Sequence, residues 1–316
     1  MTADPTEQEK AWIAVTGPTA SGKSALAMTV AGFLGGEIVG CDSVQLYRGF
    51  DIGSAKASAR DRQRIPHHLI DTLDWQEPCD ARIYAGLARQ HLRDVWSRGR
   101  VPVVVGGTGL YLRALWGDNW HEDLPADAEV RRQLEGLDNA TLLQRLQETD
   151  PDRAAQIHAN DRFRLLRAVE LVTILGGPLS GLGPAGPAVW KDICYLIHVE
   201  PERAVLHDRI RLRTREMLQS GLVEEVRALL AEGVDPGCRP MQSIGSRQVV
   251  TMLQGQLSED GLEEAIAAAT RQYAKRQGTW FRKEQPHLRL HRAELSSGQC
   301  DQLKTVRART DGGPEI

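Results

Sequence analysis

The chain has 316 residues, a formal net charge of −3 at pH 7 and 41% hydrophobic residues. This composition excludes a disordered chain, which has fewer apolar residues and more net charge. The near-neutral balance also argues against a nucleic-acid-binding protein, whose usual footprint is strongly basic. However, only seven of the 39 basic residues are lysines, and arginine is the cation suited to planar recognition of phosphate.

The termini and the cysteines indicate a cytoplasmic protein. Residues 1–10 are polar and lack the basic start and apolar run of a signal peptide. No apolar run approaches the length of a membrane span, so we expect no membrane association. The five cysteines are far apart and show no metal-ligand spacing, which predicts reduced thiols and no structural zinc.

The first third of the chain alternates strands with helices. Residues 12–16 and 37–40 read as strands, and a helix is expected between them at 25–34. A helix at 81–97 precedes the β-branched run 101–105, which is typical of a buried parallel strand. The runs 17–24 and 106–109 are Gly-rich, and another helix starts near Leu110. This order predicts an α/β fold with a parallel sheet flanked by helices.

After residue 116 the pattern changes to helices alone. Residues 127–175 show leucines at helical spacing, and the turn-rich stretch 176–187 follows them. Residues 193–199 read as a strand again, and 201–281 are helical, before a loose tail at 310–316. We therefore expect a core domain of residues 1–117 and 191–316, interrupted by an all-helical insertion at 118–190.

A phosphate-binding loop connects the first strand to its helix. Every position fits G-x-x-x-x-G-K-[ST]: Gly17, Pro18, Thr19, Ala20, Ser21, Gly22, Lys23 and Ser24. The backbone N–H groups and the helix dipole would attract phosphate, with Lys23 on the terminal phosphate and the Ser24 hydroxyl on Mg²⁺. The motif makes the core P-loop NTPase-like. It serves a kinase, an NTPase or an enzyme that expels diphosphate equally well.

Two polar residues are expected beside this loop, because ligands bind at the carboxyl ends of parallel strands. Asp42 ends the second strand and could be a general base, a Mg²⁺ ligand through water, or only a cap for the following segment. Thr108 follows the 101–105 strand and could bond a substrate or hold Asp42, or be a simple turn residue.

Seven segments resemble the tRNA dimethylallyltransferase (tRNA isopentenyltransferase) family, of the bacterial type. They are GPTASGKS (17–24), DSVQLYRGFDIGSAK (42–56), PHHLID (66–71), VVVGGTGLYLRAL (103–115), HANDRFRLLRAVE (158–170), MLQSGLVEEVRAL (217–229) and RQYAKRQGTWFR (271–282). The resemblance implies transfer of a dimethylallyl group from dimethylallyl diphosphate to N6 of adenine-37 of tRNA. It also implies a helical insertion that clasps the anticodon arm, and we expect a monomer.

The resemblance further implies roles for individual residues. Thr19 to Ser24 would grip the diphosphate and Mg²⁺ with help from Arg213, and Asp42 would accept the N6 proton, with Lys23 and Thr108 also at the catalytic centre. Beyond Asp42 and Thr108, the implied tRNA-binding residues are Ser43, Val44, Gln45, Arg131, Phe163, Arg164, Leu165, Leu166, Arg167, Gln242, Ser243, Ile244, Gly245, Ser246 and Arg247.

This sequence departs from the family pattern at two places. Ala57 stands where the family usually has proline, which is expected to loosen the following loop. Ser246 replaces an aromatic residue, which removes one stacking or packing contact.

Basic residues gather in three clusters: 162–167, 209–215 and 271–283. At helical spacing, Arg209 and Arg213 share one face while Arg211 and Arg215 share another, so only one pair can face the site. Each cluster could equally be a solvated face with ion pairs, for which Glu216, Glu224 and Glu225 offer partners.

Other readings remain open from the residues alone. An adenylate dimethylallyltransferase would use a free nucleotide as acceptor, but would not need a helical clasp. A P-loop small-molecule kinase would use Asp42 to activate a hydroxyl. A third alternative is a nucleotide-dependent RNA-binding module without catalysis.

Overall fold

The computed structural model describes residues 10–117, 124–181 and 188–310. The chain divides into two compact units, one of residues 1–116 and 189–316 and the other of residues 117–188. None of the helices that the structure describes is long and apolar enough to cross a membrane.

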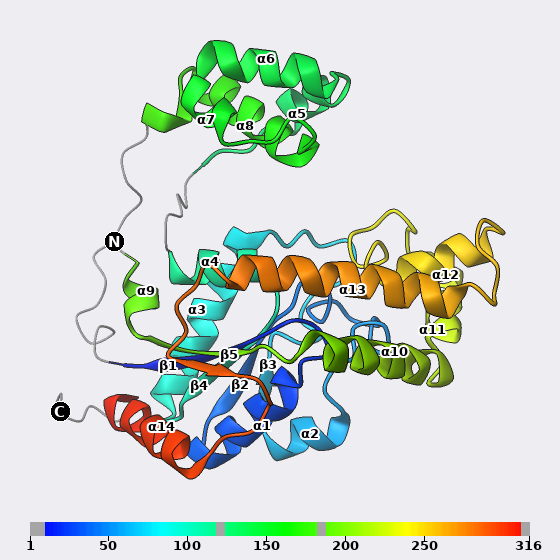
Figure 1. The fold of residues 1–316 in the computed structure, drawn as a ribbon. Coiled ribbons are helices and arrows are strands. Elements are labelled where there is room, and N and C mark those ends of the chain that lie inside the picture. Colours follow the sequence, from blue (N-terminus) through cyan, green and yellow to red (C-terminus); the bar gives the residue numbers. More distant parts are fainter. Residues whose placement is uncertain (1–9, 118–123, 182–187, 311–316) are drawn as a thin grey trace. The chain divides into compact units, whose positions relative to one another are not determined.

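A parallel six-stranded sheet forms the centre of the first unit, in the order β3-β2-β4-β1-β5-β6 (Figure 1). The strands are β1 (Trp12–Thr16), β2 (Glu37–Cys41), β3 (His67–His68), β4 (Pro102–Gly106), β5 (Cys194–Val199) and β6 (Leu288–Leu290). Residues of β1, β2, β4 and β5 are almost all buried, as expected for strands covered on both faces. The predicted parallel α/β fold is confirmed.

In its described residues, the first unit also contains ten helices, some of which cover the two faces of this sheet. They are α1 (Lys23–Leu34), α2 (Ala59–Arg64), α3 (Ala81–Ser97), α4 (Gly109–Trp116), α9 (Val189–Asp192), α10 (Arg203–Gln219), α11 (Leu222–Ala231), α12 (Ser246–Leu253), α13 (Leu262–Phe281) and α14 (Ser297–Thr310). Helices α1 and α14 lie on one side of the sheet, and α4 and α13 lie on the other (Figure 1). Apolar residues of α1 and α14 share one buried core with β1 and β4; Leu26 and Leu303 belong to it together with Ile13.

Capping residues set the helix starts. The Asp80 carboxylate accepts the backbone N–H of Ile83 at 2.8 Å, so α3 starts at the residue predicted. Helix α1 has the left-handed Gly22 at its N-cap instead, because the phosphate loop needs that conformation there.

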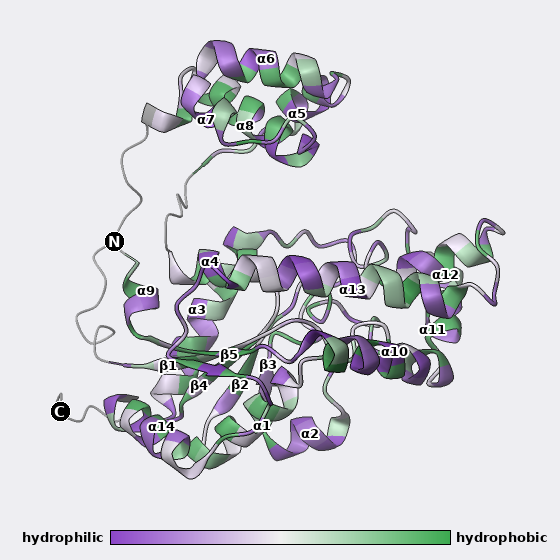
Figure 2. Ribbon diagram, viewed as in Figure 1, coloured by the Kyte–Doolittle hydropathy of each residue, from purple (hydrophilic) through white to green (hydrophobic). Residues whose placement is uncertain are grey.

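The second unit contains helices alone among its described residues. They are α5 (Ala128–Glu135), α6 (Asn139–Thr149), α7 (Pro151–Ala155), α8 (Arg162–Leu175) and the short 3₁₀ helix η2 (Leu179–Gly181). Leu142, Leu146 and Leu165 are fully buried and form its core. Figure 2 shows hydrophilic and hydrophobic residues mixed along α6 and α8, as expected for helices with one buried face.

Several elements, among them α2, lie outside the sequence-based expectations. Strands β3 and β6 are two and three residues long, and α14 occupies Ser297–Thr310. The predicted loose tail falls mostly at residues 311–316, outside the described residues.

Candidate active site

The loop between β1 and α1 has the backbone geometry of a phosphate cradle. Ala20 and Gly22 have φ of 63° and 95°, and the N–H of Ser21 donates to the Pro18 carbonyl at 3.1 Å. The loop therefore curls ahead of the N-terminus of α1, where backbone N–H groups and the helix dipole favour an anion. An Arg209 guanidinium N–H also donates to the Ser21 carbonyl at 3.0 Å, which stabilises this loop conformation.

Gln277 of α13 connects this loop to the Gly-rich loop after β4. Its Oε1 accepts the Thr19 N–H at 2.8 Å, and its Nε2 donates to the Gly107 carbonyl at 2.9 Å. A Cβ on Gly107 would lie 2.1 Å from Gln277 Nε2, so any side chain at this position would displace the Gln277 amide from the Gly107 carbonyl. The pattern of the sequence did not single out Gln277, although it lies in one of the seven family-like segments.

A cavity of about 320 Å³ opens at the carboxyl ends of the strands. Nine of the predicted site residues line it: Thr19, Asp42, Ser43, Val44, Arg213, Gln242, Ser243, Ile244 and Arg247. Arg276, from the basic cluster 271–283, also lines it, whereas sequence reasoning missed Gly53, Ser54, Ile210, Thr214, Met217, Ile266, Thr270 and Tyr273. The cavity thus joins the phosphate loop to segments from five other parts of the chain.

Asp42 combines two of the roles considered from the sequence. Its Oδ1 accepts the backbone N–H groups of Val44 at 2.9 Å and Gln45 at 3.2 Å, which makes it the cap of the following turn. The same carboxyl group lines the cavity. Within the described part of the chain, Oδ2 has no recorded hydrogen bond, so this oxygen remains available to a ligand.

Two cations face Asp42. Burial, together with the nearby Arg213 guanidinium, lowers the pKa of Lys23 to about 8, although the Asp42 carboxylate opposes this shift. Burial also lowers the pKa of Arg213, and Asp42 and Glu216 oppose this shift. Two partly buried cations stand beside a single carboxylate, so an anionic ligand bound there would stabilise their charged forms.

Thr108 lies behind the cavity wall and not in its lining. Its side chain is hydrogen-bonded to Tyr273, which does line the cavity, and burial raises the pKa of Tyr273 to about 12. The Thr108 carbonyl also accepts from Cys41, the residue before Asp42, at 3.8 Å. Thr108 therefore reaches the cavity through Tyr273 and the Asp42 strand.

The four arginines of the 209–215 cluster lie on two faces of α10, as their spacing predicted. Arg213 lines the cavity and Arg209 holds the phosphate loop. On the other face, Arg211 pairs with Asp208 at 2.5 Å and Arg215 pairs with Glu263 at 2.7 Å. In the 271–283 cluster, Arg271 pairs with Glu264 at 2.5 Å, while Arg276 reaches the cavity.

The side chains of three residues expected to contact tRNA are buried instead. Leu165 and Leu166 are 0% and 7% exposed and pack in the core of the second unit. Ser246 is 1% exposed, with its hydroxyl 3.5 Å from that of Ser243. These expectations were wrong for the side chains, because the apolar face of α8 and the first turn of α12 point into packed interiors.

Gln45 and Gly245 support the cavity without lining it. Gln45 Nε2 donates to the carbonyls of Ser54 and Ala55, at 3.0 and 3.4 Å. Gly245 has φ of 101° and starts α12, and its N–H donates to Gln248 Oε1 at 2.9 Å.

In the second unit, the buried Glu170 carboxylate gathers two of the predicted arginines. Its Oε2 lies 3.1 Å from a guanidinium nitrogen of Arg131 and 3.1 Å from one of Arg167. The Arg131 guanidinium also lies over the ring of Phe163, 5.6 Å from its centroid, and Phe163 is 69% exposed. Arg164 pairs with Asp161 at 3.3 Å. The result is an exposed aromatic ring between arginines.

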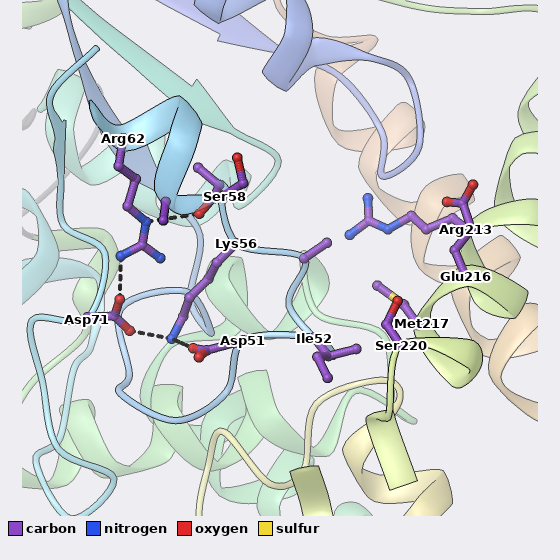
Figure 3. A pocket seen from close by; sticks show the side chains of 13 residues that line it. Asp51, Ile52, Lys56, Ser58, Arg62, Asp71, Arg213, Glu216, Met217 and Ser220 are labelled. Atoms are coloured by element: carbon purple, nitrogen blue, oxygen red, sulfur yellow. Dashed lines mark hydrogen bonds and ion pairs between the residues drawn. The ribbon is translucent and has the colours of Figure 1, made fainter. Parts of the chain in front are cut away.

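A second cavity, of about 580 Å³, lies on the other side of Arg213 and Met217 (Figure 3). The Lys56 ammonium is almost fully buried there, 2.6 Å from Asp51 and 2.5 Å from Asp71. Arg62 pairs with Asp71 at 2.6 Å, and the Ser58 hydroxyl accepts the N–H of Asp61. These contacts hold the residues on both sides of Ala57, the position at which proline was expected.

The family is decided by comparison with known proteins. A family model described as IPP transferase matches residues 45–284. The chain belongs to the IPP transferase family. A relative from Citrifermentans bemidjiense, named tRNA dimethylallyltransferase 1, is 45% identical over 86% of this chain and 89% of its own length.

Solved structures agree with this family. The tRNA delta(2)-isopentenylpyrophosphate transferase of Staphylococcus epidermidis is 34% identical, with a TM-score of 0.65 over 94% of this chain and 98% of that one. A eukaryotic dimethylallyltransferase described as acting on tRNA is 27% identical, with a TM-score of 0.72 over 86% of this chain and 70% of that one. This IPP transferase family member therefore shares its fold with nearly the whole of the first structure and with 70% of the second.

Proposed function

We propose that this chain transfers a dimethylallyl group from dimethylallyl diphosphate to N6 of adenine-37 of tRNA and releases diphosphate. One observation carries the proposal: a single cavity is lined by Thr19 of the phosphate loop, the Asp42 carboxyl group and Arg213. A donor phosphate and an acceptor nitrogen can therefore meet there. The relatives named tRNA dimethylallyltransferase support the same reaction.

On the donor side, the protein stabilises the charge of the departing diphosphate. Breaking the allylic C–O bond leaves its electron pair on diphosphate and a delocalised positive charge on the prenyl carbon. The loop N–H groups, Lys23 and Arg213 place positive charge where that negative charge develops. Because these groups lie close together, they stabilise the departing diphosphate more strongly as its negative charge grows.

The residues also fit Mg²⁺ held mainly by the diphosphate. Ser24 lies in the exposed first turn of α1, next to the cradle, and offers a hydroxyl ligand. Among the described residues there is no cluster of three or more His, Cys, Asp or Glu side chains that could hold a metal ion. Mg²⁺ commonly binds through one protein oxygen, substrate phosphates and water. When bound, it would neutralise charge on the diphosphate.

On the acceptor side, Asp42 removes the proton. Oδ1 is engaged by the Val44 and Gln45 N–H groups, which leaves Oδ2 to accept the N6 proton as the new N–C bond forms. Ser43, Val44 and the 242–247 segment enclose an adenine that has left its stack, as in base-flipping enzymes.

The helical insertion is proposed to bind the anticodon arm. Phe163 offers a stacking surface, and Arg131, Arg164 and Arg167 offer positive charge to phosphates. This accounts for RNA binding by a chain of net charge −3, since the basic residues are concentrated locally.

The salt dependence of tRNA binding tests this surface. The logarithm of tRNA affinity is expected to fall linearly with the logarithm of salt concentration, and Arg131→Ala should reduce that slope by about 1. Arg132→Ala is the control, because Arg132 is the next residue on the same helix and pairs with Glu129 at 2.7 Å. A slope that is flat, or unchanged in R131A, would contradict the proposed contact.

The pH dependence of donor use follows from Lys23. Its pKa of about 8 means that the free enzyme loses this positive charge as the pH rises through 8. We expect kcat/KM for dimethylallyl diphosphate to fall above that pH, because the protonated amine binds the donor. Lys23→Arg should shift the fall to higher pH, and a wild-type profile that is flat from pH 7 to about 9.5 would contradict this role.

The function itself is tested by the choice of acceptor. The protein is incubated with Mg²⁺, labelled dimethylallyl diphosphate and either unmodified tRNA or adenosine monophosphate. Label is expected in tRNA alone. Label in the mononucleotide would indicate an adenylate dimethylallyltransferase, and turnover of ATP without any label transfer would indicate a kinase.

A further inference from the structure

The loop of residues 51–55 forms part of the wall of the acceptor cavity. Gly53 and Ser54 line that cavity, while Asp51, Ile52 and Ala55 line the second cavity. Figure 3 shows Ile52 of this loop facing Met217 of α10 across the second cavity. The position of a short irregular loop thus affects the shape of both spaces.

Glu225 of α11 holds this loop by its backbone. Its carboxylate accepts three successive N–H groups: Asp51 at 2.9 Å and Ile52 at 2.7 Å on Oε2, and Gly53 at 3.1 Å on Oε1. Such hydrogen bonds to an ionised acceptor are stronger than neutral ones. Successive N–H groups also form a concave anion site, which here is filled by a side chain of the same protein.

The anchored loop connects to the acceptor residues in two directions. The Ser54 and Ala55 carbonyls accept from Gln45, whose own N–H is held by Asp42 Oδ1. A Cβ on Gly245 would lie 3.9 Å from Gly53 Cα, so the loop packs on the 242–247 segment. Displacing the loop would therefore move the residues that surround the acceptor, and not those of the phosphate loop.

We propose that Glu225 is a positioning residue for the acceptor adenine. It fixes the 51–55 loop, and through it Gln45 and the 242–247 segment, in the geometry that admits the base. This rests on the proposed function, since the acceptor side is defined by it. The sequence suggested instead that Glu225 pairs with nearby arginines. In that role Glu225 would not affect the position of the 51–55 loop.

The kinetic test compares Glu225→Gln with Glu224→Gln. Glutamine keeps one acceptor oxygen but turns an NH₂ group toward the loop N–H groups, whereas Glu224 is exposed and is the matched control. E225Q is expected to raise KM for tRNA about tenfold while KM for dimethylallyl diphosphate stays unchanged. Unchanged kinetics, or a fall in kcat with both KM values unchanged, would overturn the proposal. If E225Q does not fold, Glu225→Asp is measured in the same way, and the same rise in KM for tRNA alone is expected.

Hydrogen exchange tests the contact independently of activity. In the wild type, the amides of residues 51–53 should exchange slowly, and in E225Q they should exchange at least about tenfold faster, with no change in the phosphate loop. Equal exchange in the two proteins would overturn the proposal. If the wild type shows slow exchange but no transfer to tRNA, the proposed function fails while the anchoring by Glu225 stands.

Discussion

Asp42→Asn is expected to lower the transfer rate constant about 10²- to 10⁴-fold, the usual contribution of a positioned general base. Asparagine keeps a side-chain oxygen for the N–H groups of Val44 and Gln45, so the turn after β2 is preserved. An amide cannot accept the N6 proton. D42N therefore separates proton removal from the structural role of the same side chain.

This prediction is measured by single-turnover transfer at saturating tRNA and donor, with tRNA affinity determined in parallel. The affinity of D42N should equal that of the wild type, while Asp42→Ala should also loosen the turn and weaken binding. Impaired tRNA binding in D42N with a preserved single-turnover rate would show that Asp42 binds and does not catalyse.

Lys23→Met is expected to lower the transfer rate about 10²- to 10³-fold, as for the loss of one group that stabilises transition-state charge. Methionine fills much of the same space without the charge. In the free protein, burial and the nearby Arg213 lower the pKa of Lys23, and burial lowers the pKa of Arg213, so a bound diphosphate would stabilise the charged form of both. The two cations thus favour the anion that forms as the C–O bond breaks.

The measurement is the single-turnover rate at saturating donor, with Lys304→Met as the control. Lys304 lies on α14, is 65% exposed and pairs only with Asp301 at 2.7 Å among its recorded ion pairs. K304M should behave as the wild type. A K23M variant that transfers at the wild-type rate would exclude Lys23 from the donor site.

The central strands and their loops were predictable because each carries a strong local signal. β1 ends at the phosphate loop and β2 ends immediately before Asp42, and a parallel sheet brings such ends to one edge. This is why Thr19 and Asp42 could be expected together. By contrast, β3 and β6 are too short for any periodicity, and their pairing depends on neighbours distant in sequence.

The missing site residues depend on tertiary contacts that no local pattern encodes. Gln277 reaches Thr19 across 258 positions of the chain, and its helix otherwise reads as a charged surface helix. In that helix the charge pattern did not distinguish Arg271, which pairs with Glu264, from Arg276, which reaches the cavity. Glu225 resembled an ion-pair partner, because a carboxylate that binds backbone N–H groups leaves no signature in side-chain spacing.

The central claim is that one cavity joins a diphosphate cradle to a base that deprotonates adenine N6. Nucleoside analysis of tRNA after a single turnover with dimethylallyl diphosphate tests it most directly. The account predicts N6-dimethylallyl-adenosine at position 37 with the wild type, and almost none with D42N although the tRNA is bound. Prenyl groups on another atom or another nucleotide, or equal product from D42N, would contradict it.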